Sequence, residues 1–325
     1  MLASAALALV VVVLFLVGLS AGSYSISPSA LLATLTGSGE PGDQFIVLTL
    51  RLPRVVLAVL VGVAFALAGG LFQSVLGNPL ASPDVIGVTG GASAAAVLAI
   101  LVLGLSGAPV ALFAAAGALA VSAAIYLLAW RSGLHGYRFV LVGVAFAFLV
   151  EAVVSYLLTR ADVRDAQVAL VWLVGSLSGA RWEDVALLGG GLVILVPLLA
   201  ILAPRLRVLQ LGDDTATGLG LRTTAVRTGA LAVAVALAAL GTAAVGPVAF
   251  VAFASAPIAR RIVGHGLALV PTALMGAALV VGADLVGQHL LPGGQQVPVG
   301  IITGAVGAPY LLWLLARAQR TGGVV

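Results

Sequence analysis

The sequence contains no cysteine and no lysine, and only 8% of its residues are charged. The missing cysteine excludes disulfides, thiolate catalysis and cysteine metal sites. A P-loop cradles the phosphates of ATP with backbone amides and a lysine, so this chain cannot be a conventional P-loop ATPase by itself. If ATP drives its activity, another polypeptide must hydrolyse the nucleotide.

Apolar residues are what the sequence has in abundance. They make up 62% of the chain, and the mean hydropathy is +1.23, whereas soluble domains carry about 25% charged residues. The formal charge of +4 reflects scarce acids, so nucleic acid is not an expected partner. We therefore expect an all-α, polytopic membrane protein in a lipid bilayer, with residues 1–325 forming one transmembrane domain.

Apolar windows of about 20 residues, separated by glycine, proline and charged residues, predict about ten transmembrane helices. The first window lacks a preceding basic region and is long for a signal peptide, so we expect it to be retained. An external loop would follow it at 23–54. The predicted spans are 2–22, 55–74, 85–104, 108–130, 139–159, 185–203, 226–245, 247–263, 267–290 and 298–316.

Arginine placement orients these helices. With both termini in the cytoplasm, ten arginines fall on the inner side and five on the outer side. This excess follows the positive-inside rule, so we expect a multi-pass protein of the cell membrane in this orientation. The outer arginines, which the rule does not explain, are Arg51, Arg54, Arg160, Arg164 and Arg181.

The most distinctive stretch of the chain runs over residues 51–92. Two arginines flank Pro53, which suits the first turn of a helix because its missing N–H costs nothing there. The uncharged run 55–72 has eighteen residues and covers about 27 Å as a helix, close to the thickness of the hydrocarbon layer. A motif follows that we expect to line a pathway or to pack helices together; its residues are Gln73, Asn78, Pro79, Pro83, Gly87 and Gly91.

This stretch, together with 171–182 and 297–315, resembles the FecCD-type permeases of ATP-binding-cassette importers for iron-siderophore, haem and cobalamin. The resemblance implies a bundle like that of the cobalamin-importer permease and a prokaryotic cell membrane. It implies three partners: a second permease copy or paralogue, a cytoplasmic ATPase dimer and an external substrate-binding protein. Transport by alternating access would need no enzymatic activity and no cofactor in this chain, because the partner ATPase binds the ATP.

The resemblance also assigns roles to the two ends of the molecule. Arg51 and Arg54 match arginines on which the cobalamin permease docks its binding protein, whereas a third docking arginine corresponds to Gln288 and a common glutamate to Gln296. We carry no contact onto these two glutamines. The alternative for Arg51 and Arg54 is that they anchor their helix at the lipid headgroups.

On the inner side, segment 205–225 resembles the part of the family that couples to the ATPase. Asp213 or Asp214 would cap a short helix, and Gly220 would end it in a left-handed turn. An ordinary connecting loop is the alternative. The coupling residues expected from the resemblance are Gly212, Asp213, Asp214, Ala216, Leu219 and Gly220.

A cytoplasmic gate would lie at His135, Gly136 and Tyr137, although His135 is equally well explained as a solvated loop residue. Two acids, Glu151 and Asp284, fall at membrane depth, where an ionisable group points to function. They leave open a second hypothesis, an ion-coupled secondary transporter. The three histidines of the chain form no cluster in the sequence that would suit a metal site or a catalytic pair.

Overall fold

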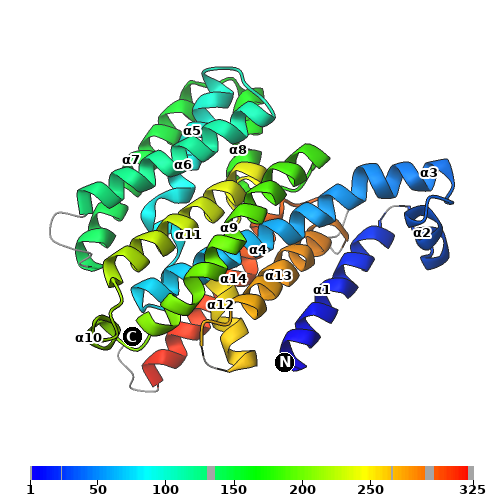
Figure 1. Ribbon diagram of the computed structural model, residues 1–325. Helices are drawn as coiled ribbons and strands as arrows, with labels where there is room; N and C mark the ends of the chain where they lie inside the picture. The colour runs from blue at the N-terminus through cyan, green and yellow to red at the C-terminus, as the bar shows by residue number, and fades with distance from the viewer. Residues whose placement is uncertain (1, 23, 130–135, 265, 290–295, 321–325) are drawn as a thin grey trace.

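The computed structural model describes residues 2–22, 24–129, 136–264, 266–289 and 296–320 (Figure 1), and every regular element in these ranges is helical. The elements are α1 (Leu2–Ser20), α2 (Pro28–Leu35), α3 (Pro41–Gln44), the π-helix η1 (Phe45–Arg51), α4 (Leu52–Leu76), the 3₁₀-helix η2 (Pro83–Ile86), α5 (Val88–Leu101), α6 (Ala108–Ala129), α7 (Gly136–Arg160), α8 (Val163–Val174), α9 (Trp182–Leu209), α10 (Asp213–Gly218), α11 (Thr223–Val245), α12 (Val251–Val263), α13 (Leu269–His289) and α14 (Val299–Arg320).

Each of the ten predicted windows contains a helix in the described part of the chain, which confirms the all-α membrane fold. Seven of the described helices are long and apolar enough to cross a membrane, so the count of ten is not confirmed. The 14 residues of α5 and the 13 residues of α12 reach only about 20 Å at 1.5 Å per residue. Irregular backbone at residues 77–87 and 246–250 adjoins these two short helices.

Helix α4 forms the centre of the bundle and packs against α9, α11, α12 and α13 (Figure 1). Most of its side chains are buried. Helices α4 and α13 come close together at Gly62, where a Cβ atom would collide with the backbone of Gly276, and the reverse holds for Gly276. Small residues bring these backbones together where lipid provides no hydrophobic drive between helices.

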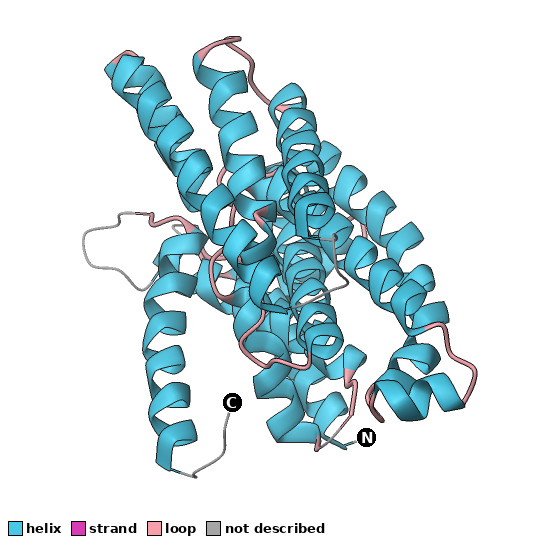
Figure 2. Ribbon diagram, turned by 90° about the vertical axis from the view of Figure 1, so that its left-hand side faces the viewer, coloured by secondary structure: helices cyan, strands magenta, loops and turns pink. Residues whose placement is uncertain are grey.

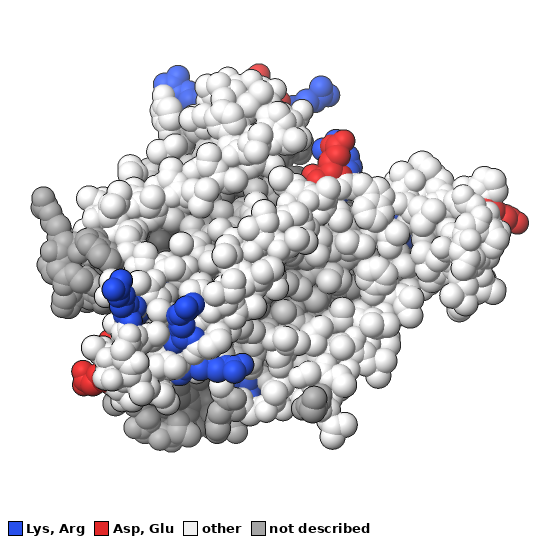
Figure 3. Space-filling model, in the orientation of Figure 1, with Lys and Arg blue, Asp and Glu red and all other residues white. Residues whose placement is uncertain are grey.

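Helices α5, α6 and α7 form a group on one side of the bundle, while α1 lies at the opposite edge (Figure 1). Many of the large apolar side chains of α1 and α7 are exposed; Phe148 on α7 is one example. Charged side chains are sparse on the face of the molecule shown in Figure 3. The beginning of α1 and the end of α14 lie at the same end of the bundle in both views (Figure 2). Termini on one side are what an even number of crossings requires.

The predicted external loop 23–54 is largely helical. It contains α2, and the following membrane helix is continuous from Pro41 rather than beginning at Val55. The π-helical turn explains how Pro53 is accommodated, since the Leu52 N–H bonds to the carbonyl of Val47, five residues back. That wider turn relieves the clash that a proline ring causes inside an α-helix.

Candidate functional site

An ion pair joins α4 to α13 at the end of the bundle that carries α2 and α3. The Arg54 guanidinium donates to both carboxylate oxygens of Asp284, with Nε–Oδ2 at 3.0 Å and Nη2–Oδ1 at 2.8 Å. Gln288, one helical turn further along α13, donates to the same carboxylate at 2.6 Å. The side chains of Arg54 and Asp284 are 17% and 6% exposed. A bidentate, largely buried pair of this kind fixes the spacing of two core helices.

Arg51 lies one turn before Arg54 and binds backbone instead. Its guanidinium donates to the carbonyls of Leu19 and Ser20 at the end of α1 and to that of Tyr24. Leu19 and Ser20 lie in the last turn of α1, which leaves carbonyl acceptors without helical partners. The Ser20 carbonyl also accepts from the Ile26 N–H at 3.2 Å. In the same loop, the charge of Asp43 raises the pKa of the Tyr24 hydroxyl, and a hydrogen bond between the two adds to the effect.

Both predicted docking arginines are thus engaged within the chain. Their guanidiniums hold α1, α4 and α13 together at this end of the bundle. The sequence marked Arg54 and Asp284 separately and did not pair them. A signal was present, because a charged group at membrane depth needs a partner of opposite charge. Docking itself stays a prediction.

The turn after α4 begins at Gly77, whose φ of 62° is left-handed and ends the helix. Asn78 closes the turn, since its Oδ1 accepts from the Leu80 N–H at 2.8 Å. Gly87, at φ 67°, then joins η2 to α5. These backbone geometries account for the asparagine and glycines of the motif without any contact to a substrate.

Three further motif residues have structural roles. Gln73 is buried at 2% exposure, and its amide donates to the carbonyl of Phe253 at 2.9 Å. Pro83 opens η2, where its fixed φ is tolerated. Gly91 lies so close to the carbonyl of Gly117 that a Cβ atom there would collide with it. These contacts place Gln73 and Gly91 in the core between α4, α5, α6 and α12, whereas Asn78 and Pro79 are exposed.

Irregular backbone near residues 175, 246 and 300 meets deep in the bundle, a contact that sequence reasoning did not predict. The Ser176 N–H donates to the Val245 carbonyl at 2.8 Å, and the Gly300 N–H donates to the Gly175 carbonyl at 3.2 Å. Three glycines, Gly175, Gly246 and Gly300, allow these backbones to touch. Non-helical backbone at membrane depth is tolerated where protein covers it or a cavity adjoins it, and a cavity of about 530 Å³ does adjoin it here.

The expected coupling segment forms the short helix α10. Gly212 is its N-cap, and neither aspartate caps it, so that expectation was wrong. Asp213 instead accepts from Arg227 of α11 at 2.7 Å, an ion pair that outcompetes the cap. The left-handed ending was right: Gly220 has φ 80°, and the N–H groups of Gly220 and Leu221 bond back into the helix as in a Schellman motif.

Residues 210–220 of the coupling segment are exposed except Ala216, which is buried. Leu211 and Leu219 lie outside the candidate membrane-spanning helices, and their apolar side chains are nevertheless 62% and 65% exposed. Of the expected gate, His135 lies outside the described residues, while Gly136 and Tyr137 begin α7. The structure therefore describes the coupling segment in detail and the gate only by its backbone.

The model of the FecCD transport family matches residues 9–317. The chain belongs to this family. It is 42% identical to the achromobactin transport system permease protein CbrC of Dickeya dadantii, with 96% of this chain and 90% of that protein covered. It is 38% identical to the Fe(3+)-citrate import system permease protein YfmE of Bacillus subtilis, with 98% and 96% covered.

A third relative of this FecCD chain is the ferric enterobactin transport system permease protein FepG of Escherichia coli, at 35% identity over 93% of this chain and 92% of that protein. Among solved structures, this chain matches an inward-facing conformation of a metal-chelate-type ABC transporter with a TM-score of 0.85 and 26% identity. The match covers 97% of this chain and 98% of the chain in that structure. The chain is thus a membrane permease that spans nearly the full length of its relatives.

The ion-coupled hypothesis rests on two acids, Asp284 and Glu151, and their surroundings differ. Asp284 is held by Arg54 and Gln288, while Glu151 lies exposed on α7. Within the described ranges, no three His, Cys, Asp or Glu side chains gather as a metal site would require. We therefore interpret Asp284 as a structural ion-pair partner.

Proposed function

We propose that this FecCD permease is the membrane subunit of an ATP-driven importer that moves a ferric chelate inward by alternating access. The substrate class follows from the three named relatives, which carry achromobactin, Fe(3+)-citrate and ferric enterobactin in their names. A separate ATPase is required because the chain has no lysine for a P-loop. The permease would work as a pair, with both termini in the cytoplasm.

The observation that carries the proposal is the exposed apolar surface of the coupling segment. Leu211 and Leu219 flank α10, and the other exposed residues of this connection are polar or glycine. Exposed apolar side chains grouped on a surface outside the bilayer indicate a protein contact. An ATPase that grips α10 would transmit its closure to α9 and α11, between which α10 lies in the chain.

At the opposite end, Arg51 and Arg54 would shape the surface that receives the external binding protein. Because both guanidiniums already bind groups of this chain, an acidic residue of the binding protein would have to share them or displace Asp284. Rim charges of this type contribute to orientation and encounter rate more than to affinity. Specificity for the chelate would then be set largely by the binding protein.

The coupling contact can be tested by co-purification from cells in mild detergent. Leu219→Asp places a charge on the exposed apolar surface of α10, and we expect the co-purified ATPase to fall strongly relative to the wild-type chain. Val163→Asp is the matched control, because Val163 is 82% exposed at the start of α8. Equal recovery of the ATPase with both variants would contradict the proposed coupling role of α10.

A further inference from the structure

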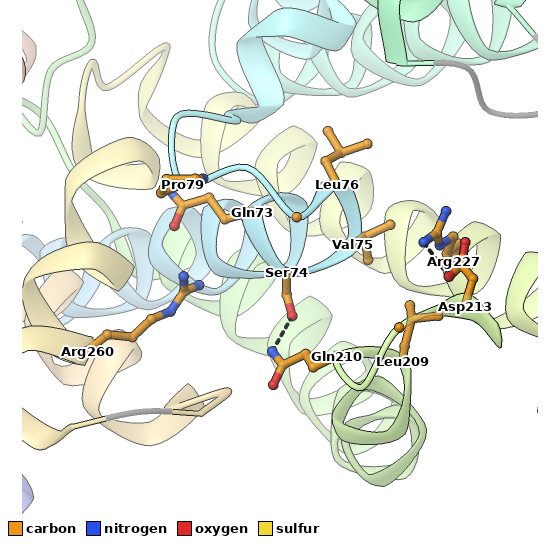
Figure 4. Close-up of a pocket in the computed structure, with 12 residues that line it drawn as sticks. Gln73, Ser74, Val75, Leu76, Pro79, Leu209, Gln210, Asp213, Arg227 and Arg260 are labelled. Carbon is orange, nitrogen blue, oxygen red and sulfur yellow. Dashed lines mark hydrogen bonds and ion pairs between the residues drawn. The ribbon is translucent and has the colours of Figure 1, made fainter. Parts of the chain in front are cut away.

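A polar cavity lies beside the coupling segment (Figure 4). It has a volume of about 600 Å³, within the range of sites that hold small ligands. The C-terminal ends of α4, α9 and α12 and the beginnings of α10 and α11 line it, and its polar side chains are Gln73, Ser74, Gln210, Asp213, Arg227 and Arg260.

Charge in the cavity is not balanced. Arg227 has Asp213 as its partner at 2.7 Å, whereas Arg260 has neither an ion pair nor a hydrogen bond with the residues that the structure describes. The Nε atoms of both arginines are shielded from solvent and lack an acceptor there. Two arginines and one aspartate leave a formal charge of +1. A partly buried guanidinium without an anion is unfavourable, because buried charges are normally paired.

The Arg260 guanidinium points toward the last turn of α4, where Gln73 and Ser74 lie (Figure 4). The Gln73 Oε1 is buried and accepts no hydrogen bond within the described chain. The Ser74 Oγ accepts from Gln210 at 2.9 Å, which leaves its own hydrogen free to donate. The cavity wall therefore offers the guanidinium of Arg260, the hydroxyl donor of Ser74 and the carbonyl acceptor of Gln73.

We propose that this cavity binds a small oxyanion that also carries an O–H group, such as hydrogen phosphate or a hydroxycarboxylate. The planar guanidinium of Arg260 binds two of its oxygens, and Gln73 accepts from its hydroxyl. The phosphodiester of a phosphatidylglycerol headgroup offers the same oxygens from a second source, with a glycerol hydroxyl as the O–H group. An anion there bridges α12 to α4 next to the Asp213–Arg227 pair that holds α10.

Calorimetric titration of the full chain in phosphatidylcholine nanodiscs, with inorganic phosphate and with citrate as probes, tests the site. Arg260→Gln removes the charge, and we expect binding to weaken about tenfold or more, as for loss of a hydrogen bond to a charged group. Arg207→Gln is the matched control, an exposed arginine at the same end of the bundle that does not line the cavity. We expect less than about a twofold change from it.

A second arm compares thermal unfolding in nanodiscs with and without phosphatidylglycerol. Stabilisation by this lipid that depends on Arg260, without binding of the soluble probes, supports a headgroup phosphate as the occupant; binding of the soluble probes supports a free anion. Arg260→Lys and Gln210→Glu serve if Arg260→Gln does not fold, and both should weaken binding. The proposal is overturned if no probe or lipid distinguishes the cavity variants from Arg207→Gln.

Discussion

The Arg54–Asp284 pair gives the most quantitative prediction. Replacing Arg54 by glutamine leaves the Asp284 carboxylate, 6% exposed, with Gln288 as its only remaining donor among the described residues. Breaking a buried ion pair by removing one partner costs about 3–5 kcal/mol, and the retained Gln288 places the expected loss near the lower end of that range.

The assay is reversible chemical unfolding of the purified chain in detergent, with a double-mutant cycle of Arg54→Gln, Asp284→Asn and the combined variant. Because neutralising both partners removes the uncompensated charge, the combined variant should be more stable than the sum of the single losses predicts, by about 1–3 kcal/mol. Arg160→Gln is the control, since Arg160 is exposed and its loss should cost less than about 0.5 kcal/mol.

Two results would refute the reasoning. One is an Arg54→Gln variant as stable as Arg160→Gln, and the other is strict additivity in the cycle. Asp284→Asn separates structure from docking, because it keeps Arg54 and removes the acid that holds it. If Arg54 docks the binding protein, uptake per folded molecule should survive in Asp284→Asn and fall in Arg54→Gln.

Two further predictions concern the coupling segment and the core. Asp213→Asn should change the free energy of unfolding by less than about 1 kcal/mol, because the ion pair of Asp213 with Arg227 is half-exposed. The same variant should lower uptake per ATP hydrolysed in proteoliposomes, and the swap Asp213→Arg with Arg227→Asp should restore part of this ratio. An unchanged ratio in Asp213→Asn would count against a coupling role of the pair. Gly62→Ala forces a methyl group into the backbone of Gly276 and should lower the free energy of unfolding by about 1–3 kcal/mol. Gly190→Ala is the control: its methyl group would meet no neighbour within 4 Å, so it should be neutral or stabilising. Equal melting temperatures for the two variants would contradict the close approach of α4 and α13.

Most of the helices could be predicted because a membrane requires long apolar segments. The left-handed end of α10 at Gly220 could be predicted too, since glycine tolerates that conformation. The failures arise from long-range or competing contacts. Asp213 looks like a helix cap until Arg227 is placed beside it, and the helix that begins at Pro41 depends on a π-helical turn before Pro53 that apolar windows do not reveal.

The Arg54–Asp284 pair illustrates the same limit, because 230 positions separate its members along the chain. The sequence marks each residue as a charge in or near the membrane, and only the packing of α4 against α13 makes them partners. Likewise, Arg260 appears in the sequence as one of ten inner arginines. Its lack of an anion becomes visible only when the cavity around it is known.

We propose that a partner ATPase drives import through this chain. The direct measurement is uptake of a radiolabelled ferric chelate by cells that express the importer, with the P-loop lysine of the ATPase replaced by alanine and, separately, with a protonophore at maintained ATP. We expect the lysine replacement to abolish uptake and the protonophore to leave it intact. Uptake that persists without a functional ATPase and stops with the protonophore would contradict the claim.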